Sequence, residues 1–232
     1  MNTKGDTTVP LLEGRGLVKA YGPAQALRGA SVRLDEGEIL AVTGTSGSGK
    51  STLLHCLAGI VGPDEGSVSY AGERLDRLPE KRLSELRRTE FGVVFQFGQL
   101  IPELTALDNV ALPLLLAGLT RADAHTRAGE WLERFGVRGQ AGLRPGEMSG
   151  GQAQRTALAR ALITGPKIVF ADEPTGALDS LASEQVMTAL VHTARESGTA
   201  VLLITHDAQV AAYADREVRM ADGTVVAVGV TA

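Results

Sequence analysis

A glycine-rich segment in the first quarter of the chain has the residue types and spacing of a phosphate-binding loop. It reads Gly44-Thr45-Ser46-Gly47-Ser48-Gly49-Lys50-Ser51 and continues with Thr52. Glycine lets backbone N–H groups approach an anion closely, and the N-terminus of a following helix adds partial positive charge. Lys50 would then reach the outer phosphates and the Ser51 hydroxyl would bind Mg²⁺. The segment predicts a nucleoside triphosphate site, although a glycine-rich turn can match such a pattern by chance.

Two acidic residues, Asp172 and Glu173, follow the apolar run 167–171. Ligands of open α/β sheets bind at the carboxyl ends of strands, and an aspartate delivered there to Mg²⁺ completes a phosphate-loop site. Glu173 would polarise a water against the terminal phosphate. Seen alone, two acids after a strand are more often an ordinary loop. The glycine-rich loop upstream favours the catalytic interpretation.

Two further polar residues follow apolar runs. His206 comes after the run 199–205, and Gln96 ends the run 91–95. We expect both at the same edge of the sheet as Asp172. His206 would contact the terminal phosphate, and the amide of Gln96 would offer its oxygen to Mg²⁺ or hold the attacking water. Each signal is weak by itself, and a single histidine is usually a satisfied surface or core residue.

A second anion site is predicted at Met148-Ser149-Gly150-Gly151-Gln152-Ala153-Gln154-Arg155. Ser149 and two glycines begin a helix, so that free N–H groups and a hydroxyl are presented together. The glycine-rich loop can already surround one triphosphate. The second site therefore needs a phosphate from elsewhere, which a second copy of the protein would supply. A capped helix start with flexible glycines is the alternative.

The elements that must position these residues follow a strand-and-helix pattern. A helix over 181–196 between two apolar strands makes a βαβ unit, which implies parallel strands. A C-terminal hairpin turns at Asp222-Gly223. The pattern predicts an α/β fold of one domain, 1–232, interrupted by a helical insertion over 97–165 in which Trp131 and Phe135 are core residues. Further expected strands lie at 17–21, 30–34, 38–42, 66–70 and 91–95, and further helices at 78–88, 120–135 and 152–164.

Composition limits the remaining possibilities. The formal net charge of −4 gives no indication of a nucleic-acid-binding surface, and we expect no nucleic acid partner. The polar start, 1–10, has no apolar core typical of an export signal. The most apolar run, 110–119, is far shorter than the ~20 residues that span a bilayer, so we expect a soluble protein. The single cysteine, Cys56, is expected to be buried.

The order of these motifs resembles that of an ATP-binding cassette ATPase, the nucleotide-binding subunit of an ABC transporter, over nearly the whole chain. The correspondences are Walker A at Gly44 to Ser51, the Q-loop at Gln96, the signature at Ser149 to Gln152, Walker B ending at Asp172, the catalytic glutamate Glu173, the D-loop Gly176-Ala177-Leu178-Asp179 and the switch histidine His206. Tyr21 resembles the aromatic residue that stacks on adenine. The signature has Met148 where leucine is usual.

The resemblance implies a fold, cofactors and partners. The fold is a P-loop NTPase core, with a mainly parallel sheet, an antiparallel N-terminal β part and a helical signature subdomain. ATP and Mg²⁺ would lie between two head-to-tail copies, or between this chain and a related ATPase subunit, with Asp179 at the nucleotide and the metal held by Ser51, Gln96 and Asp172. Integral membrane permease subunits would place the protein at the cytoplasmic face of the cell membrane as a peripheral subunit.

A finer resemblance runs from 91 to 110 and through Glu173-Pro174-Thr175-Gly176-Ala177-Leu178-Asp179. It is similar to the macrolide-export, lipoprotein-release and antimicrobial-peptide-efflux (MacB/LolD) type, which implies ATP hydrolysis that powers an exporter or a mechanotransmission complex. A non-transporting ATPase that regulates a cell-division or cell-wall complex is the alternative. Apolar residues at Leu104, Leu107 and Val110 would form either subdomain core or a groove for a membrane subunit. A P-loop kinase, a DNA-repair ATPase and a translation-factor ATPase fit the motifs less well.

Overall fold

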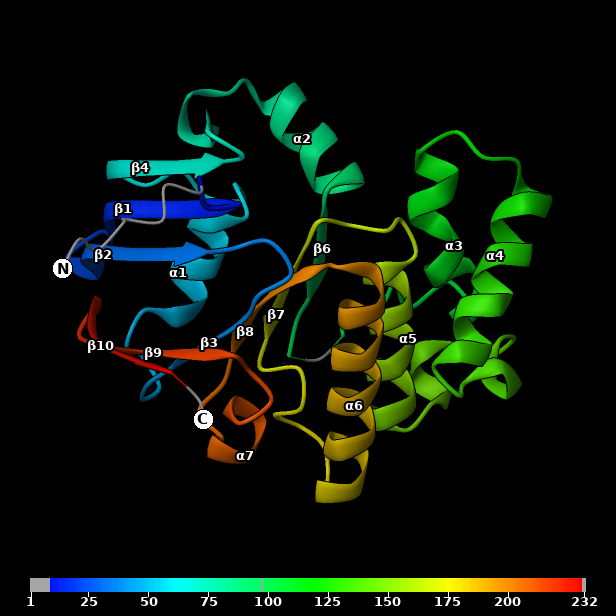
Figure 1. Ribbon diagram of the computed structural model, residues 1–232. Helices are drawn as coiled ribbons and strands as arrows, with labels where there is room; N and C mark the ends of the chain where they lie inside the picture. Colours follow the sequence, from blue (N-terminus) through cyan, green and yellow to red (C-terminus); the bar gives the residue numbers. More distant parts are fainter. Residues whose placement is uncertain (1–8, 97, 231–232) are drawn as a thin grey trace, which may run out of the picture.

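The computed structural model describes residues 9–96 and 98–230 and contains two β-sheets with helices between and beside them (Figure 1). The predicted α/β core is confirmed. The polar segment 1–8, residue 97 at the start of the predicted insertion, and residues 231–232 lie outside the described residues. In the described part of the chain, no helix is long and apolar enough to cross a membrane.

The larger sheet has six strands and carries the carboxyl ends at which a ligand would be expected. Five neighbouring strands are parallel, and the hairpin partner at the edge is antiparallel. In spatial order they are β10 (Thr224–Val230), β9 (Arg216–Ala221), β3 (Ile39–Thr43), β8 (Ala200–Ile204), β7 (Ile168–Asp172) and β6 (Phe91–Val94). The register pairs both Val42 and Asp172 with Ile204. The strand ends after β3, β8 and β7 therefore meet at one edge.

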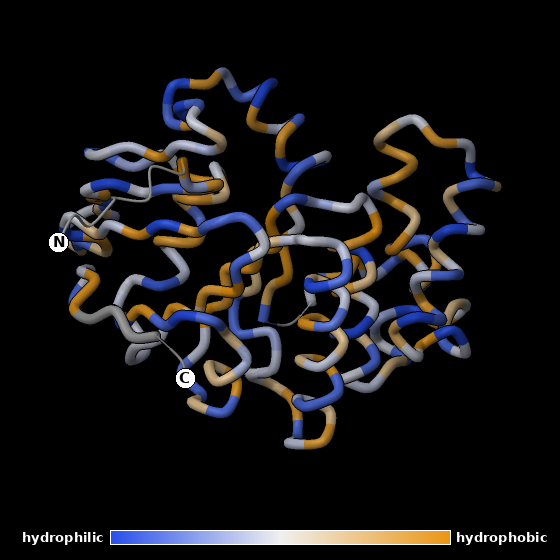
Figure 2. Tube along the Cα trace, viewed as in Figure 1, coloured by the Kyte–Doolittle hydropathy of each residue, from blue (hydrophilic) through white to orange (hydrophobic). Residues whose placement is uncertain are grey.

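Period-two alternation along the central strands divides the apolar core in two. On β3, Leu40 and Val42 face one cluster, whereas Ile39 and Ala41 face the other. A parallel sheet that is covered on both faces needs such continuous apolar strands, and Figure 2 shows them as the apolar centre of the molecule. The strands that carry the site are thus fixed from both sides.

One face of this sheet packs against α1 (Lys50–Leu57), which separates it from an antiparallel sheet. The second sheet has the order β2 (Ala24–Leu34), β1 (Leu12–Tyr21), β4 (Glu65–Tyr70) and β5 (Glu73–Arg74). Here β1 and β2 are longer than predicted. Register shifts along their pairing, such as the one between Gly14 and Leu17, interrupt the alternation that a sequence pattern would show.

The other face of the large sheet is covered by α5 (Gly150–Leu162) and α6 (Ser180–Ser197), with α3 (Ala106–Leu116) and α4 (Arg121–Arg134) packed farther out on α5 (Figure 1). The helix α3 was not predicted, because Pro113 interrupts its apolar run. It forms because Thr105 caps it and because buried Asn109 donates to three carbonyl oxygens of 101–105. The 97–165 insertion as a separate subdomain stays a prediction.

The shorter elements complete the chain. They are η1 (Leu75–Arg77), α2 (Glu80–Thr89), η2 (Arg138–Gln140), η3 (Pro145–Glu147) and α7 (Ala208–Ala211). Predicted packing is confirmed for Phe135, which is buried, and Trp131 is half-buried and stacked on it. Cys56 is buried as expected, and burial raises the pKa of its thiol to about 11.

Candidate functional site

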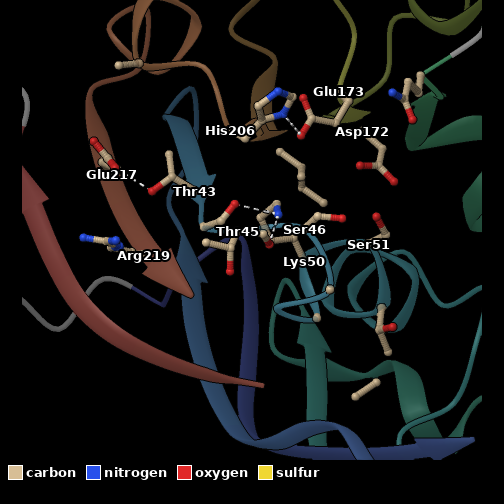
Figure 3. Close-up of a pocket in the computed structure, with 18 of the residues that line it drawn as sticks. Thr43, Thr45, Ser46, Lys50, Ser51, Asp172, Glu173, His206, Glu217 and Arg219 are labelled. Atoms are coloured by element: carbon tan, nitrogen blue, oxygen red, sulfur yellow. Dashed lines mark hydrogen bonds and ion pairs between the residues drawn. The ribbon is translucent and has the colours of Figure 1, made fainter. Parts of the chain in front are cut away.

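A cavity of about 960 Å³ opens where the carboxyl ends of β3, β8 and β7 meet. Twelve of the residues predicted from sequence line it: Gly44, Thr45, Ser46, Gly47, Gly49, Lys50, Ser51, Thr52, Gln96, Asp172, Glu173 and His206. Figure 3 shows side chains from the loop, from α1 and from the two strand ends converging on it. The fold therefore brings residues that are more than 150 positions apart in sequence into one site.

The glycine-rich loop has a backbone that only glycine can adopt at two positions. Gly44 has φ 145° and Gly49 has φ 101°. A Cβ atom would overlap the carbonyl oxygen of Met220 at the first position and that of Ala26 at the second. The N-cap residue of α1 is Gly49, which offers no side-chain cap, so the first N–H groups of the helix remain available to a ligand. The loop is built as a backbone cradle for an anion.

Two polar side chains of the loop differ in their access to the cavity: Lys50 lines it, whereas Ser48 does not. The Lys50 ammonium group is folded back onto the loop, where it donates to the carbonyl oxygens of Gly44 and Thr45, each at 2.9 Å. The Ser48 hydroxyl is buried and has no hydrogen-bond partner among the described residues. The Lys50 ammonium group, which lines the cavity, fits a phosphate group.

The residue after β7 is held in an unusual conformation. Glu173 has φ 47°, a left-handed value that is costly for a residue with a Cβ atom. Its N–H donates to Ile204 O at 3.0 Å, and its carbonyl accepts from Gly176 N at 3.1 Å. Strained backbone of this kind persists where the surroundings fix it, and it gathers at functional sites.

The fixed backbone turns the Glu173 carboxylate toward His206. Glu173 Oε1 lies 2.7 Å from His206 Nδ1, and the two side chains are drawn facing one another above Lys50 in Figure 3. Asp172 and Ser51 face each other across the other side of the same cavity. One side of the cavity therefore carries a carboxylate and an imidazole. The other side carries a hydroxyl and a second carboxylate, whose oxygens could bind a metal ion.

The strand β9 contributes residues that sequence reasoning missed. Glu217 and Arg219 line the cavity, and Glu217 Oε1 accepts from Thr43 Oγ1 at 2.6 Å. The sequence indicated only a hairpin here. The detectable signal was alternation, since buried Val218 and Met220 turn the intervening residues to the other face. What the sequence did not show is that β9 pairs in parallel with β3.

The predicted signature does not line the cavity. Ser149 caps α5 in a reciprocal pair with Gln152: Gln152 N donates to Ser149 Oγ and Ser149 N donates to Gln152 Oε1. Asp179 likewise caps α6 by accepting from Ala182 N at 2.8 Å. A Cβ on Gly151 would lie 3.2 Å from the Cβ of Ala182. The two helix starts therefore lie side by side, away from the cavity.

The aromatic residue predicted for adenine also lies outside the cavity-lining set. Tyr21 ends β1 and is 50% exposed. The Lys19 ammonium group lies 5.9 Å from its ring centroid and bonds Asp64 Oδ1 at 2.8 Å. The ring is thus available on the surface. Its predicted stacking role stays a prediction.

Comparisons with known proteins agree with this geometry. The ABC transporter family model matches residues 27–176. The lipoprotein-releasing system ATP-binding protein LolD of Geobacter metallireducens is 44% identical over 221 residues, which is 94% of this chain and 98% of that protein. The pyoverdine export ATP-binding/permease protein PvdT of Pseudomonas syringae pv. tomato is 45% identical over 222 residues, 94% of this chain, but the match spans only 34% of PvdT.

A solved structure has the same fold. The ATP-binding cassette MJ0796, in a dimeric post-hydrolysis state bound to ADP and Pi, superimposes with a TM-score of 0.90 at 36% identity and covers 95% of this chain and 99% of that one. At this identity and coverage the likeness extends beyond fold to the sequence itself. The chain therefore belongs to the ABC transporter family, as an ATP-binding cassette ATPase of the LolD and PvdT type.

Proposed function

We propose that the chain binds ATP with Mg²⁺ in this cavity and hydrolyses it to power an integral membrane partner. The observation that carries the proposal is the Glu173–His206 pair beside the glycine-rich loop. A carboxylate at this place can accept a proton from a water molecule that attacks the terminal phosphate.

The loop would hold the phosphates. Backbone N–H groups of Gly47, Gly49, Lys50 and Ser51 at the N-terminus of α1 would supply the donors. Lys50 would exchange its two carbonyl partners for phosphate oxygens, which bind an ammonium group more strongly than neutral carbonyls do. Tyr21 would stack on the adenine ring at the edge of the site.

The donor set fits Mg²⁺. Ser51, Gln96 and Asp172 offer a hydroxyl, an amide oxygen and a carboxylate, and hard divalent cations prefer oxygen ligands. No cluster of three or more His, Cys, Asp or Glu side chains that could hold a metal alone occurs in residues 9–96 and 98–230. The ion would thus need ATP oxygens as well, and it would neutralise phosphate charge.

Glu173 and His206 would act on the terminal phosphate. Glu173 orients the attacking water and takes its proton, while His206 fixes the Glu173 carboxylate and donates to a phosphate oxygen. His206 is 66% exposed, and Glu173 is only 15% exposed, so the imidazole stands at the mouth of the site. A second copy could therefore cover it.

We propose that this second copy completes the site. Ser149 and Asp179 lie on one exposed surface, and neither residue lines the cavity of its own copy. The dimer of MJ0796 with ADP and Pi supports an arrangement in which two cassettes enclose nucleotide. Each ATP would then bind the closed dimer better than the separated copies and shift the population toward closure.

The names of the relatives support a membrane partner. LolD belongs to a lipoprotein-releasing system and PvdT joins an ATP-binding part to a permease part. We propose that this chain acts with permease subunits as a peripheral protein at the cytoplasmic face of the membrane. Val110 is fully buried and so belongs to the core, whereas Leu116 on the same helix is 64% exposed and available to a partner.

The experiment measures phosphate release from ATP by the purified chain, with Mg²⁺ and with excess EDTA, followed by affinity purification from membranes. We expect Mg²⁺-dependent hydrolysis and recovery of an integral membrane protein. If the chain does not hydrolyse ATP in the presence of Mg²⁺, the enzymatic proposal is refuted. Hydrolysis without a membrane partner would refute only the transport role.

A further inference from the structure

The end of β1, where Tyr21 lies, is held by a side chain in place of a neighbouring strand. On one side, β1 pairs with β2 as far as Tyr21, which lies opposite Ala24. On the other side, the pairing with β4 ends at Val18 and Glu65. In the described part of the chain, the segment 19–21 therefore has no strand on that side, and its backbone donors need another acceptor.

Asp64 supplies that acceptor. Its main-chain N–H donates to Val18 O at 2.8 Å, which places residue 64 directly beside the end of the pairing. Its Oδ2 accepts from Ala20 N at 2.8 Å, and its Oδ1 accepts from the Lys19 ammonium group at 2.8 Å. One carboxylate thus fixes both the backbone before Tyr21 and the side chain of Lys19.

The fixed ammonium group lies over the tyrosine ring. Lys19 Nζ is 5.9 Å from the ring centroid of Tyr21, within the distance of a cation–π contact. The Lys19 side chain is only 16% exposed, whereas half of Tyr21 is exposed. The bond between Lys19 and Asp64 raises the pKa of the lysine and lowers the pKa of the aspartate, so both groups are charged at neutral pH. The ring is therefore supported by a cation and keeps exposed surface for a second flat group.

The supported ring lies close to the cavity. Ala24, which is opposite Tyr21, is two residues from Ala26, and Ala26 lines the cavity. A tyrosine that rotated freely would lose side-chain freedom each time a base stacked on it, and this loss would weaken binding. A ring that is already oriented avoids the loss. The contacts of Lys19 and Asp64 provide such an orientation before any ligand is bound.

We infer that Lys19 and Asp64 are positioning residues that orient Tyr21 for the adenine base. The inference rests on the proposed function, in which Tyr21 stacks on adenine. Neither Lys19 nor Asp64 is among the described residues that line the cavity. They should therefore set the affinity for the nucleoside part of the ligand and leave the affinity for its phosphates unchanged.

The experiment compares the affinity of the full chain, with Mg²⁺ present, for ADP, which carries the base, and for inorganic pyrophosphate, which does not. Isothermal titration calorimetry gives both dissociation constants, and phosphate release from ATP gives KM and kcat. The variants are Lys19→Met, which keeps the apolar stem, Lys19→Arg, which keeps the charge, Tyr21→Ala, and Lys19→Met combined with Tyr21→Ala. Arg15→Met is the matched control, because Arg15 lies on the same strand, is exposed and pairs with Glu13.

We expect Lys19→Met to raise the dissociation constant for ADP and the KM for ATP about three- to ten-fold. The dissociation constant for pyrophosphate and kcat should change less than about two-fold. Lys19→Arg should keep most of the ADP affinity. In the Tyr21→Ala background, Lys19→Met should have no further effect, because the cation acts through the ring. Arg15→Met should bind both ligands as the unchanged chain does.

An unchanged ADP affinity in Lys19→Met, an equal loss for pyrophosphate, or additive losses in the double variant would overturn the inference and leave the stacking role of Tyr21 in place. If Lys19→Met does not fold, Asp64→Asn takes its place, because it keeps an acceptor for Ala20 N but removes the charge that holds Lys19. If Tyr21→Ala itself binds ADP as tightly as the unchanged chain, the stacking role fails and the inference fails with it. A chain that binds neither ligand would contradict the proposed nucleotide site.

Discussion

His206 Nδ1 lies 2.7 Å from Glu173 Oε1. This contact links the ends of two neighbouring parallel strands, β7 and β8, at the mouth of the cavity. The contact depends on the left-handed backbone of Glu173, because the Glu173 N–H is itself bound to Ile204 O on β8. The proposed general base is thus oriented by main-chain bonds, and the imidazole contacts its carboxylate.

Glu173→Gln is the direct test of the general base. The amide keeps the size and the hydrogen-bonding capacity of the side chain but cannot accept a proton. We expect ATP hydrolysis to fall about a hundred- to ten-thousand-fold, while ATP binding stays within a few-fold. Steady-state phosphate release and equilibrium nucleotide binding measure the two effects. Near-normal hydrolysis by this variant would show that Glu173 is not the base.

His206→Ala tests the second member of the pair. Removing the imidazole frees the Glu173 carboxylate and removes a donor to the phosphate, so hydrolysis should fall about a hundred-fold or more. His206→Gln should recover part of the rate, because its amide retains a donor. The matched control is His192→Ala on α6, whose imidazole is exposed and, among the described residues, pairs only with Glu196. An equal loss in the control would contradict the assignment.

Two glycines of the loop compare backbone strain alone, at Gly47, with backbone strain plus lack of space, at Gly44. Gly44→Ala places a Cβ onto Met220 O and should reduce the free energy of unfolding by about 3 kcal/mol. Gly47→Ala meets nothing within 4 Å but has φ 78°, so its cost should be about 1–2 kcal/mol. Urea unfolding of both variants measures the two losses in the free energy of unfolding. A larger loss for Gly47→Ala would mean that the loop does not pack against β9 as described.

Acid should weaken the contact between α3 and α4 through Asp108. Its carboxylate accepts from Thr105 Oγ1 at 2.6 Å and contacts His125 Nε2 at 3.0 Å, and these bonds, with the charge of Arg121, lower its pKa. A carboxyl group with a lowered folded-state pKa contributes stability above its unfolded value of about 4, and that stability is lost as the pH falls through the folded-state pKa.

Asp108→Asn should therefore cost about 1 kcal/mol of unfolding free energy at pH 7, and the difference from the unchanged chain should shrink as the pH falls below about 4. Urea unfolding at several pH values measures it. A difference that stays the same at pH 7 and pH 3 would show that the charge on Asp108 does not support this contact.

Sequence reasoning predicted well which residues meet at one edge of the sheet, because the proposed chemistry restricts the residue types there. Few other residue types suit the roles proposed for Gly44, Lys50 and Asp172, so their types and order reveal them. The three-dimensional placement of His206 beside Glu173 followed from the parallel strands. The left-handed backbone of Glu173 could not be predicted, because no local residue pattern specifies it.

Features that depend on pairing between distant segments escaped prediction. Glu217 and Arg219 reach the cavity only because β9 lies beside β3. The helix α3 depends on Asn109 binding the loop before it, which outweighs the proline in its interior. The bond from Lys19 to Asp64 likewise joins segments 45 positions apart.

The central claim is that one copy's Ser149 helix start completes the other copy's ATP site. The most direct measurement compares Glu173→Gln with the double variant Glu173→Gln, Ser149→Arg by analytical ultracentrifugation with saturating ATP. The account predicts a dimer for the first and a monomer that still binds ATP for the second, because the arginine fills the surface on which the partner's phosphate would rest. ATP-driven dimerisation of the double variant at the same ATP concentration as its parent would contradict the account.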